Sequence, residues 1–187
     1  MTPLTPFRML LSSHHGWDEL AHRHPDIVHS FLRVVLPAST LAAAMLLYAG
    51  HVNGRAYAAD LSLLNWDVMV ALFWVACWGS VHLMAGFIRM AVHAEARPAY
   101  ADCYRLAGLA ALPIWLSSLT LLLPWPLFNV AIGVLGLLAS GLLLYHGLDA
   151  LFEHDDSVRT EALAYTVFSV GALVWSVLVA LILLPLL

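Results

Sequence analysis

Two short rows of polar residues interrupt the apolar segments of this sequence, and their chemistry decides where a site can lie. The first row, between residues 82 and 93, is basic, and the second, between residues 146 and 153, carries two acids. Members of each row recur three, four or seven positions apart, so each row occupies one face of a helix. A basic row facing an acidic row would form a pocket for a small ion, a lipid head group or a partner peptide. The residues of this predicted polar pocket are His82, Arg89, His93, His146, Asp149 and Glu153.

The same residues have a simpler interpretation as part of a membrane boundary. A charge at the centre of a bilayer costs roughly 2.5 to 3.5 kcal/mol on insertion scales, whereas a long side chain near a helix end can reach water. We favour this snorkelling role for Arg89, His93 and Glu153. His82 and His146 lie deeper in their apolar segments, so an interhelical hydrogen bond and a ligand role both remain open for them.

Histidine is abundant, with 10 residues in the chain, and four of these cluster near the start as His14, His15, His22 and His24. A neutral imidazole is the commonest metal ligand. The sequence nevertheless has no zinc-finger spacing, no H-E-x-x-H and no C-x-x-C motif. We therefore expect a solvated segment with no specific metal and no cofactor, and metal binding is the alternative. Nucleophile-elbow, P-loop and dinucleotide-binding motifs are also missing, so we expect no enzyme.

Apolar composition predicts the elements that must position these residues. The chain of 187 residues is 62% hydrophobic, with a mean hydropathy of +0.85, and apolar runs of 18 or more residues can cross a bilayer. The net charge of −4 and the lack of a basic stripe exclude nucleic acid as a partner. We predict an all-α polytopic membrane protein, a five-helix bundle with a short polar cytoplasmic segment at 1–26. Its membrane domain is expected at 27–187, with spans at about 27–48, 66–90, 104–123, 127–151 and 162–184.

Arginine placement predicts the orientation of the bundle. In a chain with five spans, seven arginines fall on the side of the N-terminus, and Arg55 alone falls on the other side. Arginine is enriched in cytoplasmic loops, so the N-terminus is expected in the cytoplasm and the C-terminus outside. The seven residues on the N-terminal side are Arg8, Arg23, Arg33, Arg89, Arg97, Arg105 and Arg159.

Spans three and four are expected to be antiparallel neighbours, because only Pro124-Trp125-Pro126 separates them. Small residues four positions apart allow helices to approach closely, and two such pairs occur here. They are Ala107 with Ala111 and Gly136 with Ser140.

Three further local features have structural consequences. Pro113 leaves a carbonyl of span three without its helical donor, and Ser117 or Ser118 is expected to satisfy that carbonyl. Trp66 is placed for the aromatic belt at a membrane interface. Residues 51–65 are predicted to be a loop.

Several short motifs lie between residues 97 and 153. Together they resemble the Yip (Ypt-interacting protein) domain family, and within it the YohC-like inner-membrane proteins of bacteria. The resemblance implies a five-span bundle with a cytoplasmic N-terminus in the bacterial inner membrane; Asp149 departs from it, standing where family members often carry proline. The motifs are Arg97-Pro98, Ala101-Asp102-Cys103, Ala107-Gly108, Pro113, Leu116-Ser117, Pro124 and Leu143-Leu144-Tyr145-His146-Gly147-Leu148.

Two functions are consistent with these features. The favoured one is a non-enzymatic inner-membrane protein that acts through membrane lipids, a second copy of itself or another membrane protein. Eukaryotic relatives bind Rab-type GTPases in vesicle traffic. Bacteria lack that traffic, so this role is not expected here. The alternative is a permease for a small solute, a proton or a metal ion that uses the polar residues of spans two and four.

Overall fold

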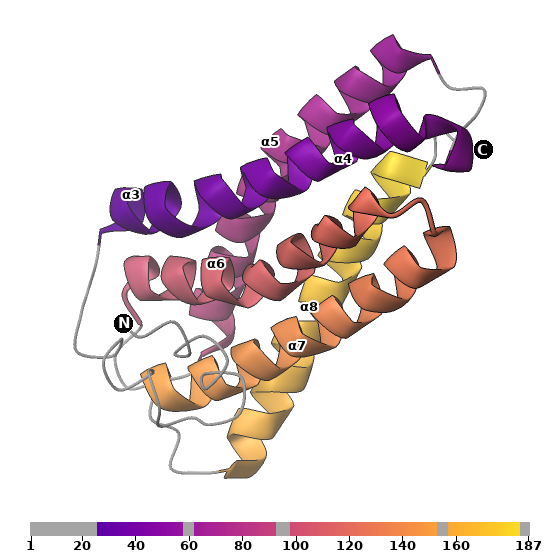
Figure 1. Ribbon diagram of the computed structural model, residues 1–187. Coiled ribbons are helices and arrows are strands. Elements are labelled where there is room, and N and C mark those ends of the chain that lie inside the picture. Colours follow the sequence, from indigo (N-terminus) through magenta and orange to yellow (C-terminus); the bar gives the residue numbers. More distant parts are fainter. Residues whose placement is uncertain (1–25, 58–61, 93–97, 153–156, 184–187) are drawn as a thin grey trace, which may run out of the picture.

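Every element of the described chain is a helix, and the helices run back and forth along one axis (Figure 1). The computed structural model describes residues 26–57, 62–92, 98–152 and 157–183. One end of the bundle, the turn end, holds the connection between η2 and α7, and the opposite end, the linker end, holds the start of α6. The elements are α3 (Ile27–Ser30), η1 (Phe31–Val35), α4 (Leu36–Tyr57), α5 (Leu63–Ala91), α6 (Tyr100–Ser117), η2 (Ser118–Leu122), α7 (Pro126–Phe152) and α8 (Ser157–Leu183).

Four helical segments in the described residues are long and apolar enough to cross a membrane. The described part of α8 adds a shorter apolar segment, Tyr165–Val177. The segments overlap the first four spans predicted from the sequence, and their length and composition agree with the predicted all-helical membrane protein. The four are Ile27–Tyr57, Leu63–Ala91, Tyr100–Leu122 and Pro126–Ala150.

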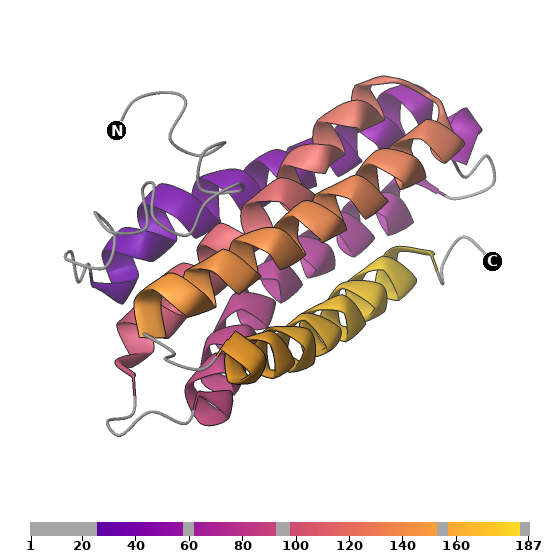
Figure 2. The ribbon, with the colours of Figure 1, turned by 90° about the horizontal axis from the view of Figure 1, so that it is seen from below.

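Helix α6 is the centre of the bundle. It packs against α5 on one side and α7 on another, and it also contacts α3, η1 and α4. The six consecutive residues from Cys103 to Gly108 are all buried, which requires neighbours on every face of a helix. Helix α8 lies outside this centre, against α5 and α7 (Figure 2).

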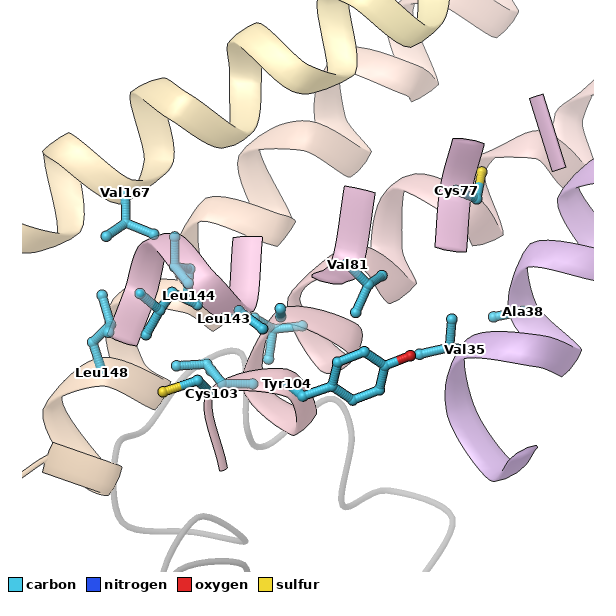
Figure 3. Packing of buried hydrophobic residues seen from close by; sticks show 14 of the residues in the cluster. Val35, Ala38, Cys77, Val81, Cys103, Tyr104, Leu143, Leu144, Leu148 and Val167 are labelled. Carbon is cyan, nitrogen blue, oxygen red and sulfur yellow. The ribbon is translucent and has the colours of Figure 1, made fainter. Parts of the chain in front are cut away.

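The main core gathers side chains from η1, from α6 and from the other four long helices (Figure 3). Tyr104 of α6 is fully buried and extends toward Val35 of η1. Leu148 of α7 and Val167 of α8 are also fully buried. Because lipid tails are as apolar as these side chains, close packing rather than exclusion of water holds such a core together.

A row of indole groups joins α5 to α4. The Nε1–H of Trp66 donates to the carbonyl oxygen of Leu46 at 2.8 Å. Trp74 lies about two turns further along α5, and Trp78 about one turn beyond it. They donate to the hydroxyls of Thr40 and Ser39 at 3.2 and 3.1 Å. Trp66 is only 4% exposed, so its predicted place in an interfacial belt is wrong. The hydrogen bond to α4 offsets the cost of burying the indole N–H, and a lipid-facing ring would not make this bond.

The predicted loop at 51–65 is also wrong over its first half and at its end, because α4 continues to Tyr57 and α5 begins at Leu63. The Tyr57 hydroxyl donates to the Leu123 carbonyl at 2.9 Å, and the Asn53 amide donates to the Leu121 carbonyl at 3.5 Å. Asn53 itself has a non-helical backbone, with φ −114° and ψ 16°. These contacts with the turn end hold a polar segment in helical form although its composition is typical of a loop.

Helices α6 and α7 approach closely where Gly136 faces the backbone at Pro113. A Cβ atom on Gly136 would lie 3.0 Å from the Pro113 carbonyl oxygen and 3.2 Å from Cα of Ile114. The Ser117 and Ser118 hydroxyls donate instead to the carbonyls of their own helical turn, at Ile114 and Trp115. A hydroxyl has one proton, so neither serine also serves the carbonyl that Pro113 leaves free, and that expectation is wrong.

We expect Gly136→Ala to lower the free energy of unfolding by about 1 to 2 kcal/mol, because backbone atoms of α6 cannot yield as a flexible side chain does. Gly133→Ala is the matched control on the same helix, since a Cβ there meets nothing within 4 Å. Alanine at that position should be neutral or stabilising through its higher helix propensity. Unfolding in mixed micelles with increasing denaturing detergent measures both, and equal stabilities of the two variants would contradict the close approach.

Candidate functional site

His82 of the predicted polar pocket meets two tyrosines of α6. Its Nδ1 lies 2.9 Å from the Tyr100 hydroxyl oxygen. The imidazole lies nearly parallel to the Tyr100 ring, with an interplanar angle of 14°, and its centroid is 4.7 Å from that of Tyr104. The basic row of α5 therefore runs beside the first turns of α6. Of the two interpretations left open for His82, the observed contact is an interhelical hydrogen bond.

The other described members of the predicted pocket are distributed along the linker end. Arg89 is exposed near the end of α5. His146 and Asp149 are half-buried on α7, where the His146 ring lies edge-on to Tyr145. No ion pair joins Asp149 to Arg89 in the described part of the chain.

His93 and Glu153 lie outside the described residues. The complete pocket of six residues therefore stays a prediction.

Among the described residues, sequence reasoning missed the most deeply buried charge of the linker end. Arg105 was counted only as a topology signal, yet it is 4% exposed at the centre of the bundle. Its Nη2 lies 3.8 Å from Oδ1 of Asp102, three residues earlier on α6, whose side chain is 14% exposed. The i, i+3 spacing of opposite charges was the available signal. An ionisable pair inside a membrane bundle marks a functional candidate.

An apolar cavity of about 100 Å³ lies between α5, α6, α7 and α8. Ala107 and Ala111 of α6 and Ser140 of α7 line it, so three of the four small residues predicted for helix packing border this space. The Ser140 hydroxyl oxygen is buried, and no described group hydrogen bonds to it. Met84, Phe168 and Gly171 form part of the opposite wall.

A second cavity, of about 160 Å³, lies nearer the turn end. Ile114, Trp115 and Trp175 line both cavities, so the two spaces adjoin. Four polar residues contribute to the second cavity, which we call the turn-end cavity. They are Ser117, Ser118, Thr120 and Asn129.

The four histidines proposed as alternative metal ligands, His14, His15, His22 and His24, lie outside the described residues. Within the described ranges, no group of three histidine, cysteine, aspartate or glutamate side chains is placed to hold a metal ion. Both cysteines, Cys77 and Cys103, are buried and free. The arrangement at hand can thus bind by shape and hydrogen bonding, through two cavities and a charged linker end.

Comparison with known proteins agrees with this membrane architecture. The model of the Yip1 domain matches residues 7–184. The chain is also 31% identical over 124 residues to the "Inner membrane protein YohC" of Escherichia coli strain K12 and to that of E. coli O6:H1. The matched region covers 65% of this chain and 62% of each relative, so the chain matches about three fifths of the length of these relatives. No solved structure matches.

Proposed function

This chain belongs to the Yip1 domain family, and we propose that it is a non-enzymatic inner-membrane protein that acts by binding lipid within its helix bundle. The apolar cavity between α5, α6, α7 and α8 carries the proposal. Apolar cavities of about 150 Å³ stay free of water and take up apolar guests. An acyl chain is the most abundant such guest in a membrane, and here the cavity adjoins a second one that would extend its length.

Lipid binding has better support than the permease alternative. A permease needs a hydrated polar path through the bundle. Among the described residues that line the apolar cavity, only Ser80 and Ser140 carry a hydroxyl, and none is ionisable. The proton of Ser80 is already donated to the Cys77 carbonyl. A protein partner, either a second copy or another membrane protein, would bind in addition to the lipid. Its place would be the linker end, where Arg89 is exposed.

Filling the apolar cavity should displace the lipid. We expect Gly171→Leu to reduce the lipid that copurifies with the full chain by at least about tenfold, because the new side chain occupies the space. Gly86→Leu adds the same atoms to α5 where a Cβ meets nothing within 4 Å, and it should retain lipid. Native mass spectrometry of the chains released from lipid nanodiscs measures the bound lipid. Equal lipid retention by both variants would refute the proposal.

We further propose five spans, with α8 as the fifth and the N-terminus in the cytoplasm. Helix α8 has 27 residues, which at 1.5 Å per residue exceeds the roughly 30 Å of a hydrocarbon core. It also packs against two of the other long helices, α5 and α7. The seven arginines on the N-terminal side support the orientation.

Reporter fusions test this topology. Alkaline phosphatase fused after Leu187 should be active, because that enzyme folds only outside the cytoplasm, and a fluorescent protein at the same position should stay dark. Fusions at Asp155, between α7 and α8, should give the opposite pair of signals. A bright fluorescent protein after Leu187 would show an even number of spans or an inverted bundle.

A further inference from the structure

The two adjoining cavities form one elongated space along the bundle axis. On α6 the lining residues run from Ala107 in the apolar cavity to Ser117 in the turn-end cavity, which is about 15 Å at the helical rise per residue. The same order holds on α8, where Phe168 lines the apolar cavity, Trp175 lines both cavities and Val179 lines the turn-end cavity alone. A molecule that fills both cavities therefore lies lengthwise in the bundle.

The volumes of the cavities suit a single hydrocarbon chain. An apolar cavity of about 150 Å³ takes up one benzene molecule, and the two cavities here have volumes of about 100 and 160 Å³. Together they hold on the order of ten carbon atoms. Two acyl chains side by side would not fit, so the space selects a lipid that inserts one unbranched acyl chain.

The packed core closes the linker end of this space. Ala107 of α6 and Leu144 of α7 line the apolar cavity there, and both are buried. About one turn nearer the linker end, Tyr104 and Leu148 of the same two helices are fully buried in the main core. An acyl chain that enters the space must therefore end at this level.

The opposite limit of the space lies close to the end of the bundle. Thr120 of η2 and Asn129 in the first turn of α7 line the turn-end cavity, and both stand next to the connection between these two elements. A polar head group is costly to bury unless it is hydrogen-bonded. The head group of a bound lipid therefore belongs at the turn end, with its acyl chain directed toward the core.

Phe168 marks the closed limit of the space on α8. It is the lining residue of α8 nearest the linker end. Its ring lies against α7, since a Cβ atom on Gly141 would be 2.6 Å from Cε2 and 2.8 Å from Cδ2 of the ring. The ring thus covers the contact between α7 and α8 at the level where the acyl chain must end.

We propose that the joined cavities bind one unbranched acyl chain lengthwise, with the head group at the turn end and the terminal methyl group against Phe168, which limits the length of the acyl chain. This inference rests on the proposed lipid-binding function and specifies the lipid and its orientation. Further methylene groups would press against the ring, and overpacking a close-packed interior is unfavourable.

Photo-crosslinking to the unmodified protein in lipid nanodiscs tests the orientation. One probe is hexadecanoyl lysophosphatidylcholine with a diazirine at the end of its acyl chain, and its isomer carries the diazirine beside the ester group. We expect the first probe to label the segment around Phe168 and the second to label residues 117–120, with excess unlabelled lipid suppressing both signals. Mass spectrometry of the peptides locates each label. The reverse pattern would overturn the orientation.

The preferred length of the acyl chain tests the role of Phe168. Lysophosphatidylcholines from decanoyl to octadecanoyl are supplied as a mixture, and native mass spectrometry measures which of them the protein retains. The unmodified protein should show a maximum at one length. Phe168→Ala should raise retention of the longest acyl chain, relative to that maximum, by at least about fivefold, because it removes the ring. Leu173→Ala is the matched control on α8, since Leu173 is 64% exposed, and it should leave the preference unchanged.

The outcomes separate this inference from the proposed function. An unchanged length preference in Phe168→Ala, with lipid still bound, would overturn the role of Phe168 and leave lipid binding intact. No suppressible label from either probe, together with no retained lysolipid, would refute lipid binding in the bundle. The crosslinking comparison uses the unmodified protein, so it does not depend on the folding of any variant.

Discussion

Replacing Asp102 by asparagine is expected to lower the free energy of unfolding by about 3 kcal/mol, because removing one member of a buried ion pair is strongly destabilising. The other member is the guanidinium of Arg105, which is 4% exposed and lies 3.8 Å from the Asp102 carboxylate. Unfolding of the purified chain in mixed micelles, followed by circular dichroism, measures the loss. The double variant Asp102→Leu with Arg105→Met should be more stable than Asp102→Asn, because it removes both charges.

An exposed pair at the other end of the bundle provides the control. His51 Nε2 and Asp67 Oδ1 are 2.7 Å apart, and both side chains are 46% exposed. Exposed pairs contribute little, about 0 to 1 kcal/mol, because the surrounding water weakens their attraction. Asp67→Asn should therefore cost much less than Asp102→Asn. Similar small losses for the two variants would show that the buried pair does not stabilise α6.

Gly50→Ala is expected to destabilise the bundle by a comparable amount, about 3 kcal/mol. A Cβ atom on Gly50 would overlap the indole of Trp66. The indole cannot swing away cheaply, because it is buried and donates to the Leu46 carbonyl. Thermal unfolding of the purified chain, monitored by circular dichroism, measures this effect.

Two variants show whether the overlap is the cause. Gly54→Ala adds the same methyl group to α4 where nothing lies within 4 Å, so it should have little effect. Trp66→Leu makes room for the methyl group, and adding Gly50→Ala to Trp66→Leu should cost much less than adding it to the unmodified chain. Additive losses in the double variant would contradict the contact between Gly50 and Trp66.

The membrane architecture follows from the sequence because bilayer thickness sets the length of an apolar helix. Helix boundaries are harder to predict from the sequence, because they depend on contacts with residues far along the chain. Residues 51–57 have the composition of a loop, and hydrogen bonds from Asn53 and Tyr57 to the turn end keep them helical. Trp66 was misplaced for the same reason, because its partner lies on another helix.

The candidate site was predictable only in part. Helical spacing shows that His82 and Arg89 share a face, but it does not reveal which helix that face meets. The structure sets His82 against Tyr100 and Tyr104, while Asp149 stands on α7. The cavities depend on how four helices pack against one another, and no local sequence pattern encodes that packing.

Mass spectrometry of the full chain purified in its native lipid tests lipid binding within the bundle most directly, when lipid, metal and protein are quantified together. We predict at least one tightly held lipid molecule per chain, which remains bound after the surrounding lipid is removed by detergent. A stoichiometric metal ion with no retained lipid would contradict lipid binding and favour a permease.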